Sequence, residues 1–363
     1  MKSIFFFIFC AVIFASFGIN DECGIISITA SGDCLNFRLK GSGIAIVDYG
    51  DGSEKDTIVF QYPNDRGNWS EIKRTNLDKN QRTVTISGKN ITDLDCDSKL
   101  LILQEGRSYP RCNQITKLDV SKNIALKSLV CSNNQLTDLD VSKNIALTSL
   151  FCFNNQLTDL DVSKNSALTH LSCDNNQITV LDVSKNTALA LLSCGNNQLP
   201  ELNVSRNTSL TILGCKNNSF AALDVSKNTA LVHLICSNNQ LTELNVSKNT
   251  VLEHLICFDN QLTTLDVAQN TSLKELRCNN NQLISLDVSR NMSLVVLYCN
   301  DNQFSSGALN LLFSMLHENI VTVVDEDKVD HIMTKIINKD NNPGSVDCDR
   351  SIAERKGWFI ESF

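Results

Sequence analysis

The stretch Leu147–Asn165 reads LTSLFCFNNQLTDLDVSKN, and the same line returns 21 residues later at Leu168–Asn186 as LTHLSCDNNQITVLDVSKN. Within each line, Leu-x-Cys alternates with period two, which predicts a short strand with one buried face. An asparagine three residues after the cysteine predicts a tight turn, because its amide can bond to backbone groups. Nine consecutive lines place their cysteines in one column: Cys131, Cys152, Cys173, Cys194, Cys215, Cys236, Cys257, Cys278 and Cys299.

The second half of each line repeats the apolar spacing and ends on a second asparagine column. In the quoted line this half is Leu160–Asn165. We therefore expect each line to form one coil with two extended arms and two turns. A single coil buries too few apolar side chains to offset the entropy lost on ordering it, so the coils must stack and share a core. The sequence predicts a mainly β solenoid.

The line Leu-x-x-Leu-x-Cys-x-x-Asn-x-Leu resembles the nested 21-residue leucine-rich repeats of secreted bacterial proteins, notably from the Bacteroidetes, and is loosely internalin-like. The segment Ile46–Ser53 looks like the hairpin of PKD-type, immunoglobulin-like domains, and residues 342–358 are similar to the closing segment of such repeat proteins. The resemblance implies a right-handed leucine-rich-repeat coil in an exported binding or adhesion protein. It implies no catalytic residues.

Five segments are expected along the chain. Residues 1–18 combine one positive charge, an apolar run and a small-residue exit, which predicts a secretory signal peptide; the alternative, a membrane anchor, needs a longer apolar run. Residues 19–88 carry short β-prone runs and predict a small antiparallel β domain. Residues 89–114 predict an N-terminal cap or irregular first coil, residues 115–304 the array of nine repeats, and residues 305–363 an α/β C-terminal cap.

The C-terminal cap is expected to close the last coil. Apolar spacing predicts a helix over residues 307–317, and a short helix is expected over residues 351–356. Trp358, together with Leu312 and Phe313, should cover the core, because an uncovered solenoid end exposes apolar surface.

The net charge of -8 and the absence of a Lys/Arg cluster argue against nucleic acid and against an anionic membrane surface. No stretch after the signal peptide could cross a membrane. We expect a monomer that is secreted, either extracellular or on the cell surface, with the periplasm as a further option.

The cysteine column fills inward apolar slots, where cysteine behaves as a small hydrophobe. Parallel neighbours in register also give poor disulfide geometry, so we predict packing rather than a metal or redox device. Elsewhere, Cys23 and Cys34 could form a local disulfide in an oxidising compartment. Cys96 and Cys112 are a second candidate pair, and the partner of Cys348 is left open.

Side chains beside the buried columns point outward onto the sheet face and vary from coil to coil. Aromatic and aliphatic groups on a face that does not need them indicate a binding patch; the alternative is drift of an unselected surface. The predicted ligand-binding residues are Phe151, Phe153 and His170 in a first patch, Ile235, His254, Ile256 and Phe258 in a second patch, and Tyr298.

Three other groups have common structural explanations. Asp48–Gly52 could hold calcium, but an acidic hairpin turn is more frequent. The second-arm aspartate column runs beside a lysine column, which predicts a compensated, solvated face. His233 and His254 share a column, with Glu275 next, and could supply a metal or pH-sensing site; unligated surface histidines are more common. We predict no metal and no cofactor.

The sequence contains no nucleophile elbow, phosphate loop or H-E-x-x-H motif, so no enzyme is expected. The expected function is binding of a macromolecular partner, by protein–protein interaction or adhesion, through the outward sheet face. One alternative is a cell-surface glycan-binding protein that stacks sugars on Phe151, Phe153, Phe258 and Tyr298. The other is a structural, self-associating surface protein.

Overall fold

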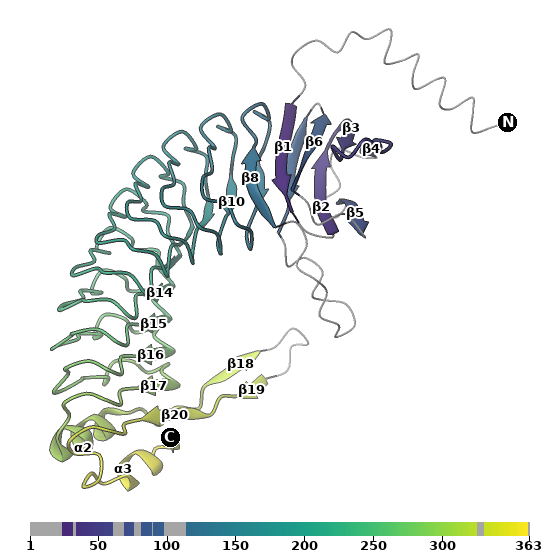
Figure 1. Ribbon diagram of the computed structural model, residues 1–363. Coiled ribbons are helices and arrows are strands. Elements are labelled where there is room, and N and C mark those ends of the chain that lie inside the picture. The colour runs from purple at the N-terminus through teal and green to yellow at the C-terminus, as the bar shows by residue number, and fades with distance from the viewer. Residues whose placement is uncertain are drawn as a thin grey trace. The chain divides into compact units, whose positions relative to one another are not determined.

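The computed structural model describes residues 24–31, 34–60, 69–75, 81–88, 90–97, 114–324 and 330–361. The chain divides into two compact units, Met1–Leu147 and Thr148–Phe363, which are described separately below (Figure 1). The expected signal peptide at residues 1–18, Cys23, Cys112 and the side chain of Cys34 lie outside the described residues. Both candidate disulfides therefore stay predictions. In the described part of the chain, no helix is both long and apolar enough to cross a membrane.

The first unit contains a five-stranded antiparallel sheet, which confirms the predicted small β domain. Strand β1 alternates buried and half-buried residues, with Ile26 and Ile28 fully buried, as the period-two pattern requires. The resemblance of the segment Ile46–Ser53 to a PKD-type domain stays a prediction. From one edge to the other the strands are β4 (Asp56–Phe60), β3 (Gly43–Asp48), β6 (Arg82–Gly88), β1 (Gly24–Ala30) and β8 (Ile115–Asp119).

Strand β8 was expected at the start of the repeat array, but it pairs antiparallel with β1. The sequence of β8 corresponds to the second half of a repeat line. No complete repeat line precedes it in the sequence, so one edge of β8 is free to pair with β1. A further set of strands in this unit runs in the order β5 (Ser70–Thr75), β2 (Cys34–Gly41), β7 (Ile91–Asp95) and β9 (Ser128–Val130). The sequence missed β5, in which Ile72 is the one apolar residue.

The second unit confirms the solenoid. Short strands follow one another in parallel and in register, so that Leu150 lies beside Leu171 and each central leucine is buried. The second arms, expected to be extended, form no strand, although Leu160 and Val162 are buried. The strands are β10 (Ser149–Phe151), β11 (His170–Ser172), β12 (Leu191–Ser193), β13 (Ile212–Gly214), β14 (His233–Ile235), β15 (His254–Ile256), β16 (Glu275–Arg277) and β17 (Val296–Tyr298).

The first turn of each coil depends on two neighbouring residues, of which the second is asparagine and the first is asparagine or, at Asp259 and Asp301, aspartate. Asn154 adopts a positive φ of 55°, a left-handed conformation that asparagine tolerates better than most residues. In the next coil, Asn176 donates from Nδ2 to the carbonyls of Cys152, at 3.1 Å, and Cys173, at 3.0 Å. Its Oδ1 accepts from the backbone N–H of Leu157 at 3.0 Å. One side chain therefore satisfies backbone groups of two coils, which explains the unbroken column.

The second turn explains the aspartate column. The Oδ1 atom of Asp161 accepts from the backbone N–H of Ser163 at 2.8 Å, an Asx turn. This hydrogen bond is the main reason why the pKa of Asp161 is lowered, and the charge of Lys164 contributes less. The geometry of the turn is thus the first explanation of the aspartate column, and compensation of its charge by the lysine column is the second. Behind it, Asn186 donates to the carbonyls of Val162 and Asn165 at 3.0 and 2.9 Å.

The C-terminal cap continues the strand array and covers its end. Helix α2 (Ser306–Met315) begins at Ser305, whose hydroxyl accepts from the Ala308 N–H, and buries Leu312 and Phe313. Trp358 is also buried, and its Nε1 donates to the His317 carbonyl at 3.1 Å. The remaining elements are β18 (Thr322–Val324), β19 (Asp330–Ile332), β20 (Lys335–Asn338), α3 (Ser351–Glu354) and β21 (Trp358–Glu361).

Strands β20 and β21 extend the parallel stacking beyond the repeats. Strand β20 pairs in parallel with β17, and β21 pairs in parallel with β20. The α/β cap predicted from the sequence is confirmed, but it is more than a lid, because it adds two strands to the face that the repeats build.

The cap packs tightly at Gly344. Its N–H donates to the Phe304 carbonyl at 2.9 Å, and a Cβ atom placed on it would lie 1.9 Å from the backbone nitrogen of Ser306. Gly344→Ala should therefore destabilise the protein by about 2 kcal/mol or more, measured by chemical denaturation. Gly307→Ala is the matched control, since the nearest atom to its added Cβ is 3.9 Å away; it should be neutral or stabilising. Equal midpoints for the two variants would contradict this packing.

All nine cysteines of the repeat column are fully buried. Burial raises the pKa of the Cys215 thiol well above its usual value, and that of Cys236 to about 12. The thiols are therefore protonated and shielded at neutral pH, which suits packing better than metal binding or redox chemistry.

Cys215→Ser should destabilise the protein by about 1–3 kcal/mol, because it buries a hydroxyl in an apolar slot. Cys215→Ala is the control without a polar atom and should cost the same or less. Thermal denaturation and the rate of thiol labelling in the native state measure both effects. Rapid native labelling, combined with an unchanged melting temperature for the Ser variant, would show that the column is accessible.

Candidate binding surface on the strand face

Two rows of side chains cross the strands of the second unit and together form what we call the strand face; Asn338, near the cap end of one row, is buried. The leading row contains the first residue of each repeat strand, and the trailing row contains the third. The leading row is Ser149, His170, Leu191, Ile212, His233, His254, Glu275, Val296, Ile336 and Phe359, and the trailing row is Phe151, Ser172, Ser193, Gly214, Ile235, Ile256, Arg277, Tyr298, Asn338 and Glu361.

The first predicted patch lies at β10 and β11. Phe151 is in the trailing row beside Ser172, and Phe153 follows two residues later; both rings are half-buried. His170 is exposed, lies diagonally across from Phe151 on the next strand, and shares a 2.9 Å hydrogen bond with the hydroxyl of Thr169. Phe151 therefore lies near both Phe153, on its own arm, and His170, on the next strand.

A polar stretch with small side chains separates the two patches. The carboxylate of Asp174 accepts from the hydroxyls of Ser172 and Ser193 at 2.9 and 2.8 Å, and from the Gly195 N–H at 2.8 Å. Gly214 continues this stretch in the trailing row, where an added Cβ would lie 3.0 Å from the Ser193 hydroxyl. In the trailing row the two patches are thus separated, whereas the leading row carries Leu191 and Ile212 between them.

The second predicted patch lies at β14 and β15. Ile235 and Ile256 are direct neighbours in register, and Phe258 follows Ile256 two residues later. All three side chains are half-buried rather than fully exposed. Truncating these side chains to alanine will therefore lower the stability of the protein, whereas truncating an exposed ring without neighbours would lower it hardly at all.

Beside this patch runs a chain of polar contacts that continues into the cap. The rings of His233 and His254 stack with centroids 4.5 Å apart, and His254 Nδ1 lies 2.9 Å from a Glu275 carboxylate oxygen. The other oxygen of Glu275 accepts from Arg277 Nε at 2.5 Å. The Arg277 guanidinium lies 4.9 Å from the centre of the Tyr298 ring.

Tyr298 connects this chain to the cap, because its hydroxyl donates to a Glu361 carboxylate oxygen at 2.7 Å. Sequence reasoning placed Tyr298 in the site and Glu275 beside His254, but it missed the roles of Arg277 and Glu361. The position of Arg277 between Ile256 and Tyr298 in its column was the available signal. For Glu361 no such signal existed, because its register depends on how β20 and β21 pair.

The contacts shift the pKa values of this group. Burial raises the pKa of Glu275, but the hydrogen bonds from His254 and Arg277 outweigh it, so the net pKa is lowered. The pKa of His233 is lowered, first by burial and then by the charge of His254. The hydrogen bond to Glu361 raises the pKa of Tyr298.

In the described residues, no group of three or more His, Cys, Asp or Glu side chains is arranged to hold a metal ion. The carboxylate that contacts His254, that of Glu275, already accepts from His254 and Arg277. Its role there is to fix these side chains.

The turn at Asp48–Gly52 likewise uses its carboxylates internally. Asp48 accepts from the Gly50 N–H at 2.9 Å and pairs with Lys55 at 2.8 Å. Asp51 accepts from the Ser53 N–H at 2.9 Å. These contacts fit the hairpin-turn interpretation of this segment.

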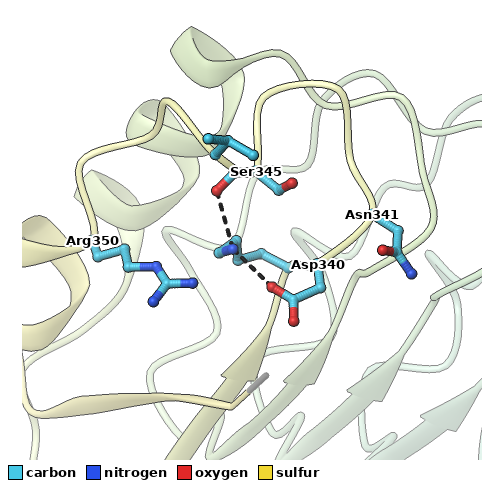
Figure 2. Close-up of a pocket in the computed structure, with 6 residues that line it drawn as sticks. Asp340, Asn341, Ser345 and Arg350 are labelled. Atoms are coloured by element: carbon cyan, nitrogen blue, oxygen red, sulfur yellow. Dashed lines mark hydrogen bonds and ion pairs between the residues drawn. The ribbon is translucent and has the colours of Figure 1, made fainter. Parts of the chain in front are cut away.

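A pocket of about 360 Å³ lies in the cap, lined by Lys339, Asp340, Asn341, Ser345, Val346 and Arg350 (Figure 2). Lys339 follows the trailing-row residue Asn338, the place that cysteine takes in the repeats, and only 2% of its side chain is exposed. Its ammonium donates to Asp340 at 2.8 Å and to the Ser345 carbonyl at 3.1 Å. These contacts close the end of the core, so the pocket walls have a structural role.

A scan of protein-family models and a search of curated proteins found no match. Among solved structures, the functional domain of InlJ from Listeria monocytogenes, described as including a cysteine ladder, is 36% identical with a TM-score of 0.58. The alignment covers 70% of this chain and 50% of that one, so the chain spans about half the length of the InlJ domain.

A second similar structure is the internalin inlF from Listeria monocytogenes strain 4b F2365, with 20% identity and a TM-score of 0.51, covering 69% of this chain and 74% of that one. At this identity the likeness concerns the fold alone. The InlJ likeness goes further, because it combines the repeat with a cysteine column, and it relates this chain to the Listeria internalins.

The lowered pKa of His233 gives the strand face a pH dependence with a defined sign. The unfolded chain binds a proton at this residue more readily than the folded one, so stability is fully present above about pH 6.5 and is lost as the pH falls below it. Between pH 7.5 and 5.5, wild type should lose more stability than His233→Gln, and the difference should be small because solvent screens the site. Urea denaturation at both pH values measures this; overlapping pH profiles would contradict it.

Proposed function

We propose that this leucine-rich-repeat solenoid, related to the Listeria internalins, is an exported protein that binds a protein partner through the strand face of Thr148–Phe363. The observation that carries the proposal is the second patch, where Ile235, Ile256 and Phe258 lie together on strands whose fold does not require apolar side chains there. The first patch, around Phe151 and Phe153, supplies a second contact area.

The composition of the strand face supports a protein partner. Protein interfaces are enriched in aromatic residues and arginine, and a few such anchors contribute most of the binding energy. The trailing row places the aliphatic side chains of the second patch beside Arg277 and Tyr298. Sugars stack on exposed aromatic faces, whereas Phe151, Phe153, Phe258 and Tyr298 are all half-buried. The kinship with internalins supports binding rather than catalysis.

A screen of the mature protein against extracellular proteins, a glycan array and itself separates the proposed function from its two alternatives. A saturable protein partner would support the proposal. Binding to glycans alone would overturn it in favour of a lectin. Concentration-dependent association of the chain with itself, without any other partner, would favour the structural role.

Once a protein partner is known, the double variant Phe153→Ala and Phe258→Ala should weaken binding by about several hundredfold or more, since each aromatic anchor of an interface contributes on the order of 2 kcal/mol or more. Because both rings are half-buried, the variant should also lose about 1–3 kcal/mol of stability. Circular dichroism and denaturation check that it remains folded at the assay temperature. Calorimetric titration measures the affinity.

Lys227→Ala is the matched control, because this exposed lysine follows the Asp224 turn on the other side of the coil. It should leave the affinity unchanged. Loss of binding through Lys227, with the phenylalanine pair silent, would place the site on the second arm.

A further inference from the structure

Arg277 is held in place from two sides. Its Nε donates to Glu275 at 2.5 Å, and its guanidinium lies 4.9 Å from the centre of the Tyr298 ring. Both supports are themselves fixed. His254 contacts the second oxygen of Glu275, and Glu361 accepts the hydroxyl hydrogen bond of Tyr298. The side chain of Arg277 therefore has few alternative rotamers, and little entropy remains to be lost when it binds something.

The outer end of this guanidinium is available. Arg277 is 40% exposed, and within the described ranges its two terminal amino groups donate to no protein acceptor, because Glu275 uses Nε alone. An arginine whose only role was to neutralise Glu275 would not need the aromatic support of Tyr298. Terminal guanidinium nitrogens presented side by side fit the two oxygens of a carboxylate.

The neighbours of Arg277 define what accompanies that carboxylate. The trailing row reads Ile235, Ile256, Arg277 and Tyr298 on four successive strands, at steps of about 4.8 Å. Two aliphatic side chains thus precede the cation and an aromatic ring follows it. An extended peptide with an acidic residue between apolar residues matches this order. An acidic sugar matches it less well, because it has nothing to place on Ile235 and Ile256.

We infer that Arg277 binds a carboxylate of the protein partner, and that the recognised segment carries an acidic side chain flanked by apolar ones. This inference rests on the proposed function and specifies its partner. The net charge of -8 repels acidic molecules in general, so acidic segments will bind where a positioned cation and apolar contacts coincide.

The test uses the full mature chain and two capped hexapeptides in which every second residue faces the same way: one carries leucine, glutamate and leucine at these positions with serine between them, and the other has glutamine in place of the glutamate. The glutamate peptide should bind at least about tenfold more tightly at pH 7, because a charge-assisted pair replaces a neutral hydrogen bond. Arg277→Lys keeps the charge but loses the planar fork, and should reduce the affinity for the glutamate peptide about tenfold while leaving the glutamine peptide unaffected.

Arg290→Lys is the matched control. Arg290 is exposed and lies on the second-arm turn beside Asp287, away from the strand face. It should not change the affinity for either peptide.

Three outcomes would overturn the inference: equal binding of both peptides, no effect of Arg277→Lys, or Arg277-dependent binding of a galacturonic acid oligosaccharide with no binding of the glutamate peptide. The proposed function is tested separately through Phe153 and Phe258. If those variants abolish partner binding while the peptides fail to discriminate, the strand face remains the site and the acidic-partner inference alone is wrong.

Discussion

The structure depends on buried asparagine side chains that take the place of regular backbone pairing at the turns. A solenoid with coils this short buries carbonyl and N–H groups at every corner, and each needs a partner. Asn176 offers two donors and one acceptor, and all are directed at backbone atoms of its own and the preceding coil. Asp in its place would bring a buried charge and no donor. This requirement keeps the period at 21 residues and leaves the strand face unconstrained.

The fold does not fix the outward side chains of the strand face, so their variation from coil to coil is informative about binding. Inside, leucine, cysteine and valine recur because the core is close-packed, with Phe220 and Phe304 as larger residues in one leucine column. Outside, the trailing row changes from Phe151 through a small polar stretch at Ser193 and Gly214 to the aliphatic and charged group at Ile235 to Tyr298. An interface needs apolar anchors and a few oriented polar groups. The second patch supplies both, and the chain of contacts from His254 to Glu361 orients the polar ones.

The sequence predicted the repeated parts of the molecule. It was a weaker guide where one contact determines how two segments are placed. Nine aligned cysteines predicted the buried column, and the spacing of Ile235 and Ile256 predicted their contact. The second arms, which were expected to be extended, form no strand, because their Asx turns and buried asparagines already satisfy the backbone. Nothing in the sequence pairs Glu361 with Tyr298, since that contact joins residues 63 apart through the register of two cap strands.

The cap therefore contributes to the candidate site as well as to stability. Asn342 repeats the asparagine interaction once more, accepting from the Phe304 N–H at 3.1 Å and donating to the Cys299 carbonyl at 3.0 Å. That contact sets β20, which in turn sets β21 and brings Glu361 to Tyr298. If Tyr298 lost this hydrogen bond, the ring beneath Arg277 could rotate and the guanidinium would lose its second support. The end of the solenoid is thus coupled to the strand face by one continuous series of contacts.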